Sequence, residues 1–119
     1  NAISVSPFGY LRDPHKPDFI RRSDRVGSEN DASLLAALQW ARALGMRVML
    51  KPHILMSGPH WGWAGMVEMT SAEDWKIFFD RYERWMRHYA MLAEIYGFDS
   101  LCLGVELVKT TLGHQAEWR

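Results

Sequence analysis

The sequence is short of three things that would place it in particular classes of protein. It has one cysteine in 119 residues, so no internal disulfide can form. It has no apolar run approaching the roughly 20 residues that a membrane-spanning helix needs. It has no charge excess, because 14 Lys and Arg residues balance 14 Asp and Glu residues. The balance leaves no electrostatic footprint for nucleic acid or an anionic membrane, and we expect neither as a partner.

Motifs for metal and phosphate chemistry are also missing. The spacing of His15, His53, His60 and Glu106 matches no strong ligand pattern such as HExxH. No glycine-rich phosphate loop follows a strand pattern, and no serine nucleophile elbow is present. The single cysteine, Cys102, lies inside an apolar run, where a small core residue is its ordinary role. The sequence predicts no metal and no cofactor.

Aromatic residues, in contrast, are abundant, with six Trp, four Tyr and five Phe. Many fall within residues 71–96 at helical spacing, which predicts an amphipathic helix with an aromatic, core-facing stripe. Thr70 or Ser71 can cap its start, and Gly97 can end it. A second amphipathic helix is predicted over residues 31–44.

Three short apolar segments, at residues 2–6, 47–51 and 101–107, predict strands. Together with the helices they alternate in the order β-α-β-α-β, and residues 115–119 have the pattern of another helix start. Such alternation predicts an α/β protein with a parallel sheet and right-handed crossovers.

The connections from strand to helix are unusually long. Residues 7–30 and 54–70 are predicted as loops, whereas ordinary connections have about 2–6 residues. Both leave the carboxyl ends of strands, where parallel α/β proteins place their chemistry. We therefore expect the functional site at this rim of the sheet.

Glu106 is the strongest single candidate for chemistry. It stands near the end of an apolar segment, where a carboxylate is costly unless it is paired or used. Parallel strands in register would bring Ser6, His53 and Glu106 to one rim, with Lys51 a layer deeper. The alternative is a structural ion pair in which Lys51 and Glu106 lock two strands together.

The second long loop contains Trp61 and Trp63, one residue apart and bracketed by glycines. Aromatic faces over a polar cleft suit sugar rings, whose C–H faces stack on π-systems. The alternative for each tryptophan is a plug that closes the base of the loop. Phe8 and Tyr10, just after the first predicted strand, are weaker versions of the same signal.

Several segments together resemble glycoside hydrolase family 113, which comprises (β/α)8-barrel β-mannanases and their relatives in a clan of retaining enzymes. The matching segments are Lys51-Pro52-His53-Ile54, Trp63-Ala64-Gly65-Met66, Tyr89-Ala90-Met91-Leu92-Ala93-Glu94, Leu103-Gly104-Val105-Glu106-Leu107 and Trp118-Arg119. The resemblance implies that the three strands are about the second to fourth of a TIM barrel. It also implies a retaining hydrolase that acts on β-mannan or a related β-glycan.

The resemblance implies roles for individual residues. Glu106 matches the general acid/base, with the nucleophile on a late strand outside these residues. The side chains expected to line the sugar subsites are those of Lys51, His53, Trp61, Trp63, Ser6 and Tyr10. Many clan members have Asn directly before the acid/base, whereas Val105 stands there in this sequence, so the contact to the sugar 2-hydroxyl must come from elsewhere.

The chain is predicted to be a single fragment, residues 1–119, because a closed barrel needs about 200 residues or more. We expect it to need the rest of the barrel or self-association, and to have no hydrolytic activity alone. One alternative is a carbohydrate-binding or scaffold barrel that lost catalysis. Another is an unrelated small α/β domain that binds a partner through the aromatic loop. The resemblance slightly favours a secreted or periplasmic location.

Overall fold

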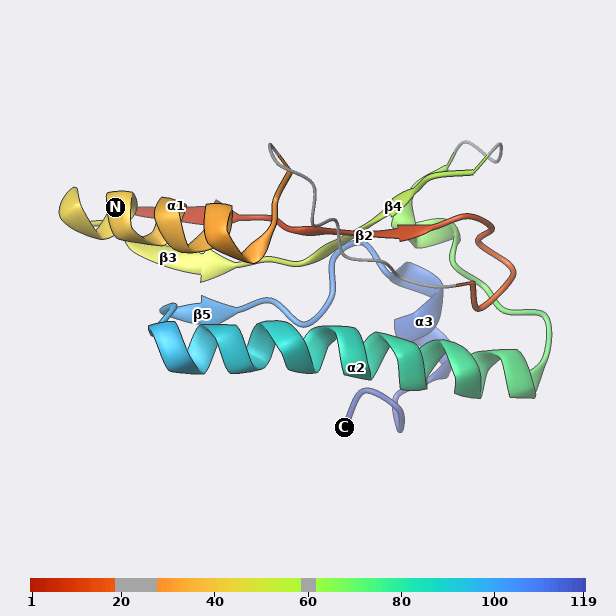
Figure 1. Cartoon of the computed structure of the whole chain (residues 1–119). Helices are drawn as coiled ribbons and strands as arrows, with labels where there is room; N and C mark the ends of the chain where they lie inside the picture. Colours follow the sequence, from red (N-terminus) through yellow and green to blue (C-terminus); the bar gives the residue numbers. More distant parts are fainter. Residues whose placement is uncertain (19–27, 59–61) are drawn as a thin grey trace.

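The structure is a computed structural model that describes residues 1–18, 28–58 and 62–119 (Figure 1). Its strands are β1 (Ala2–Val5), β2 (Phe8–Leu11), β3 (Arg47–Leu50), β4 (His53–Met56) and β5 (Ser100–Leu101). Its helices are α1 (Asp31–Ala43), α2 (Ala72–Tyr96) and α3 (Val108–Gly113), with a short 3-10 helix, η1 (Ala64–Met66). Within these ranges no helix combines the length and apolarity that crossing a bilayer requires.

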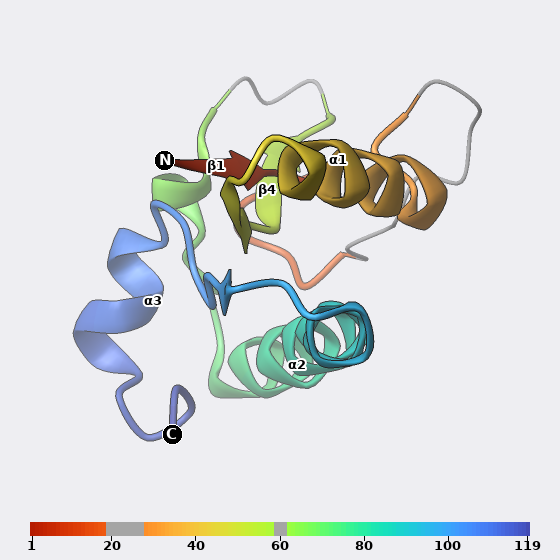
Figure 2. The same cartoon turned by 90° about the vertical axis from the view of Figure 1, so that its left-hand side faces the viewer.

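All described strand pairs are parallel. One sheet has the order β1-β3-β5, and β2 pairs with β4. The strands predicted from sequence therefore do lie side by side with α-helical crossovers between them, which confirms the α/β fold class. Figure 2 shows α1 and α2 toward one side of the strands, with α3 toward the other.

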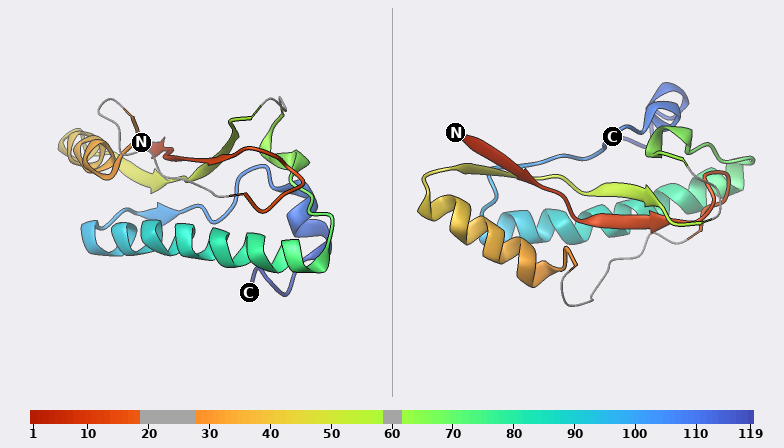
Figure 3. Two further views of the ribbon diagram at one scale, coloured as in Figure 1. Left: turned by 45° about the vertical axis from the view of Figure 1, so that its right-hand side comes forward. Right: turned by 90° about the horizontal axis from the view of Figure 1, so that it is seen from above.

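The pairs β1–β3 and β2–β4 are two parts of one long ribbon. Ala2 pairs with Arg47 and Phe8 with His53, so both pairs have the same offset, since 47 − 2 and 53 − 8 each equal 45. In Figure 3, β2 continues the direction of β1 and β4 continues that of β3, and the two continuous segments lie side by side. The ribbon carries residues past the first strand ends and toward the loops.

Prolines interrupt this ribbon without ending it. Pro7 and Pro52 both lie fully buried between its two halves. The hydrogen bonds continue across them, because the Lys51 N–H donates to the Val5 carbonyl at 2.8 Å and the His53 N–H to the Pro7 carbonyl at 2.9 Å. Proline removes one donor but has an extended-compatible φ. The predicted loops at 7–30 and 54–70 are therefore wrong at their starts, where β2 and β4 lie.

Both long helices begin and end as their sequence signals predict. The Asn30 side chain accepts the Ser33 N–H at the start of α1, and the Ser71 hydroxyl accepts the Asp74 N–H at the start of α2. Gly97 ends α2 in the left-handed conformation, with φ of 77°, which a residue without Cβ adopts at little cost. The side chains that α2 buries are those of Phe78, Tyr82, Trp85, Met86, Tyr89, Leu92 and Ala93.

The predicted strand over residues 101–107 is wrong beyond its first residue. β5 ends at Leu101, and the Cys102 N–H makes one more bond to the Leu50 carbonyl at 2.9 Å. Leu103, expected to be buried, is 56% exposed. The next helix is α3, at Val108–Gly113, whereas the predicted helix start at 115–119 is a turn. Among the described strands, β5 pairs with β3 alone and lies at the edge of the sheet.

Candidate active site

The face of the ribbon opposite α1 and α2 carries most of the side chains predicted from sequence. Side chains alternate along a strand, and one set, which includes Val48, Leu50 and Ile54, is buried. The other set contains Lys51 and His53 from the β3–β4 segment. Its members from the β1–β2 segment are Ser6, Phe8 and Tyr10, and the constant register places Ser6 opposite Lys51 and Phe8 opposite His53.

Glu106 approaches this face at His53. The Glu106 Oε2 atom lies 3.7 Å from His53 Nε2, with the two side chains 52% and 21% exposed. The His53 ring also lies beside Phe8, with ring centroids 6.0 Å apart. His53 Nε2 is buried and has no hydrogen-bond partner among the described residues. A shift of under about 1 Å would turn the contact with Glu106 into a hydrogen bond, and the carboxylate remains open to water.

The backbone at Glu106 is strained. Among the described residues other than glycine, Glu106 alone has a positive φ, at 58°. For an L-residue this conformation costs roughly 1–2 kcal/mol. Strained backbone persists only where the surrounding contacts hold it, and it concentrates at active sites and ligand clamps. Glu106 therefore lies in a bend after the sheet, and the prediction that it stands on a strand is wrong.

Lys51 is on the same face as His53 but does not pair with Glu106. No ion pair joins Lys51 and Glu106 among residues that the structure describes. Lys51 instead lines a hollow of about 500 Å³, together with Asp99, Ser100 and parts of β1 and β3. The alternative of a structural Lys51–Glu106 lock is not formed, because the chain leaves the sheet at Cys102 and carries Glu106 past Lys51 to His53.

Trp63 stands at the start of η1 and is 52% exposed. Its indole ring lies over Gly65, where an added Cβ would come within 2.3 Å of the Trp63 Cη2 atom. Glycine at 65 therefore permits the ring to rest on the backbone. About half of the Trp63 side chain is therefore accessible in the part of the chain that the structure describes. Trp61 and its prediction lie outside the described residues.

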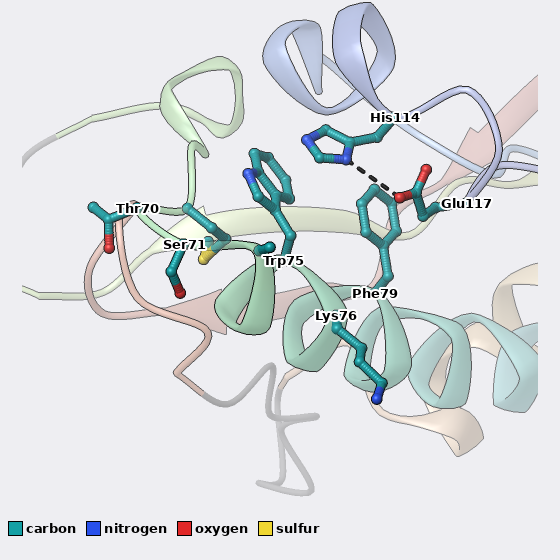
Figure 4. Close-up of a pocket in the computed structure, with 9 residues that line it drawn as sticks. Thr70, Ser71, Trp75, Lys76, Phe79, His114 and Glu117 are labelled. Carbon is teal, nitrogen blue, oxygen red and sulfur yellow. Dashed lines mark hydrogen bonds and ion pairs between the residues drawn. The ribbon is translucent and has the colours of Figure 1, made fainter.

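A separate pocket lies on α2 near its start (Figure 4), and its lining includes none of the site residues predicted from sequence. It has a volume of about 470 Å³, and its lining includes Trp75, Phe79, His114 and Glu117. His114 lies against Trp75, with ring centroids 3.9 Å apart, and its Nδ1 atom is 3.5 Å from Glu117 Oε1. Glu106 does not line this pocket, and the contacts of His114 join the end of α3 to α2.

Glu68 and Lys109 form an ion pair that ties the start of α3 to the loop before α2. The hydrogen bond and the positive charge of Lys109 lower the pKa of the Glu68 carboxyl, and the charge of His15 adds to the effect. A carboxyl with a lowered pKa contributes stability that is complete above the pKa of a free glutamate. That contribution is lost as the pH falls through the lowered value.

We therefore expect the Glu68 carboxyl to titrate below a free glutamate when its 13C shift is followed by NMR. Replacing Lys109 by methionine removes the hydrogen bond and the charge, and is expected to raise the titration midpoint toward the ordinary value. Arg84→Met, which breaks an exposed pair with Asp80 on α2, serves as the control and should leave the midpoint of Glu68 in place. If the titration midpoint of the Glu68 carboxyl is the same in Lys109→Met as in the unmodified protein, the Glu68–Lys109 ion pair does not form in solution.

Comparison with known proteins places these observations in a family. The model of Glycoside Hydrolase Family 113 matches residues 7–119. Among solved structures, the chain is similar to a family 113 β-mannanase from Alicyclobacillus acidocaldarius in complex with ManMIm. The TM-score is 0.86 and the identity 28%, and the match covers 99% of this chain and 38% of that one. A comparison with curated proteins found no match.

Two further structures show the same fold. One is a complex of a family 113 β-1,4-mannanase, with a TM-score of 0.79 and 22% identity, covering 98% of this chain and 38% of that one. The other is a family 113 β-1,4-mannanase with a TM-score of 0.77 and 23% identity, covering 97% and 37%. The chain thus spans less than two fifths of the length of these structures.

Proposed function

The chain belongs to glycoside hydrolase family 113, and from that premise we propose that it is the acid/base-bearing part of a retaining β-glycoside hydrolase. The observation that carries the proposal is the approach of the Glu106 carboxylate to within 3.7 Å of His53 on the open face of the ribbon. A half-exposed carboxylate on a strained backbone, beside a histidine, suits proton transfer to a bound substrate.

In this proposal Glu106 acts twice. It first protonates the glycosidic oxygen of the leaving sugar, and then removes a proton from the water that hydrolyses the glycosyl-enzyme intermediate. The nucleophile would be a second carboxylate about 5–5.5 Å from Glu106, on a strand outside these 119 residues. His53 Nε2, buried and without a partner in the described structure, would donate to a sugar hydroxyl or to Glu106 itself.

The other predicted side chains would hold the sugar. Ser6 and Lys51 lie in one row of the ribbon and Tyr10 lies farther along it, so their polar groups would meet hydroxyls along the substrate. Trp63 offers an exposed indole face for stacking on a sugar ring, and we assign the same role to Trp61. β-mannan or a related β-glycan is the proposed substrate, and the β-mannanase from A. acidocaldarius is the relative that favours it.

The chain is proposed to form a single structural unit that acts only within a complete barrel. β1 and β5 each have a strand on one side only among the described elements, and an unpaired strand edge needs another strand or a cover. Residues beyond these 119 would supply the remaining strands and the nucleophile. The isolated chain is therefore expected to hydrolyse no glycan.

The proposal is tested with the full-length protein that contains this chain. The protein is incubated with β-mannan, with other β-glucans and with aryl β-glycosides, and the products are followed by NMR. We expect hydrolysis of β-mannan or a close relative, with the anomeric configuration of the first product retained. Inversion would contradict the two-step mechanism. Binding of mannan without hydrolysis would overturn the proposal in favour of a catalytically inactive carbohydrate-binding or scaffold barrel.

A further inference from the structure

The segment that carries Glu106 receives little support from the sheet. Its last hydrogen bond to a neighbouring strand is that of the Cys102 N–H, four residues before Glu106. From the other side, α2 supplies a bond. The buried Tyr82 hydroxyl of α2 donates to the Leu103 carbonyl at 2.7 Å. The Tyr82 hydroxyl thus holds the backbone by a hydrogen bond at Leu103, one residue after the strand pairing ends.

A second aromatic side chain closes over the same segment. The Trp118 ring packs on Gly104, where an added Cβ would lie 3.1 Å from Trp118 Cη2. The rings of Tyr82 and Trp118 meet edge-to-face, with centroids 5.5 Å apart. The indole N–H of Trp118 donates to the Thr110 carbonyl in α3 at 3.0 Å. Residues 103 and 104 are therefore clamped between α2 and the turn after α3.

The clamp explains how Glu106 keeps an unfavourable backbone. A left-handed glutamate relaxes unless contacts on both sides prevent it. On the far side, the Thr110 hydroxyl donates to the Leu107 carbonyl at 2.9 Å. On the near side, the hydrogen bond from the Tyr82 hydroxyl to the Leu103 carbonyl is a polar contact between α2 and the segment. Loss of that bond would free the backbone on the near side of Glu106.

We propose that Tyr82 is a positioning residue for the acid/base, and that it acts through the Leu103 carbonyl to hold the Glu106 carboxylate where it meets the glycosidic oxygen. The inference rests on the proposed function of Glu106. Tyr82 itself does not touch the substrate. Its ring is buried in α2, between Phe78 and Trp85. Burial raises the pKa of the Tyr82 hydroxyl, so the hydroxyl remains a donor over the whole working pH range.

The variant that isolates the hydroxyl is Tyr82→Phe, because it keeps the ring contacts. In the full-length enzyme, kcat and KM are measured for a series of aryl β-mannosides with leaving groups of rising pKa, and for mannan. If the Glu106 carboxyl is misplaced, the rate should fall most for substrates whose leaving group departs only when it is protonated. We expect kcat/KM, which reports the step in which the leaving group departs, to fall by about 10- to 10²-fold on mannan and on the poorest leaving groups, since misplacement of about 1 Å costs up to about 10²-fold.

Activated aryl mannosides need little protonation when the leaving group departs, so their kcat/KM should lose less than about threefold. Tyr89→Phe, which removes another buried tyrosine hydroxyl from α2, is the control. It should not lower the rate on poor leaving groups more than the rate on activated ones. An equal loss on all leaving groups would overturn the proposal, because it would leave Tyr82 a merely structural residue. The absence of any loss would overturn it as well. If the leaving-group dependence is absent in Glu106→Gln too, the proposed function of Glu106 fails as well. If it is present in Glu106→Gln and absent in Tyr82→Phe, only the positioning role of Tyr82 is overturned.

Discussion

Replacing Glu106 by glutamine in the full-length protein is expected to lower turnover of β-mannan by about 10²–10⁴-fold. Glutamine keeps the size and the hydrogen-bonding shape of the side chain but can neither donate the proton to the leaving oxygen nor accept one from water. The loss in kcat/KM should shrink on aryl mannosides with good leaving groups, because their departure needs little protonation. Steady-state kinetics on both kinds of substrate measure the effect.

Glu83→Gln is the matched control for this experiment. Glu83 is an exposed carboxylate on α2 that pairs with Arg87 one turn away, and such surface pairs contribute about 0–1 kcal/mol to stability. Its replacement should leave turnover within about twofold, since surface changes of this kind have small effects. Unchanged turnover in Glu106→Gln, with the protein folded, would remove Glu106 from the acid/base role.

The second large effect is expected in the core, at Phe78. Replacing Phe78 by alanine should lower the free energy of unfolding by about 3–5 kcal/mol. Phe78 is 1% exposed. Its ring lies within 6 Å of three other rings, those of Trp75, Phe79 and Tyr82. The truncation removes this buried surface and leaves a cavity that α2 cannot close. Denaturant unfolding of the full-length protein, analysed for the transition that includes this segment, measures the change.

Trp40 provides the contrast. It is another large aromatic residue on a helix, in α1, but it is 72% exposed. Trp40→Ala should therefore change the free energy of unfolding by no more than about 0.5 kcal/mol, as surface substitutions generally do. Equal losses at both positions would mean that the burial on which the predicted core depends is not present in solution.

Local signals were sufficient for the two long helices and for the parallel order of the three predicted strands. Ser71 caps α2 and Gly97 ends it because capping and left-handed turns depend on a few neighbouring residues. The aromatic stripe of α2 follows from its helical spacing. The placement of Lys51 and His53 on one face follows from strand alternation and from parallel pairing. The family resemblance, carried by short motifs, implied that Glu106 is the acid/base.

Other features depend on partners that are distant in sequence. The strands β2 and β4 resume after Pro7 and Pro52 because the ribbon supplies hydrogen bonds across the prolines, and no local pattern records that pairing. The segment after Cys102 is as apolar as a buried strand, yet it leaves the sheet.

The sequence by itself determined the two long helices, the parallel order and the type of residue at the candidate site. Only the tertiary structure decided that Glu106 bends toward His53, and that Tyr82, 21 residues before Leu103 in the chain, holds the segment. Helix caps and periodicity act over a few residues, whereas the conformation of an edge segment is set by whichever distant groups satisfy its backbone.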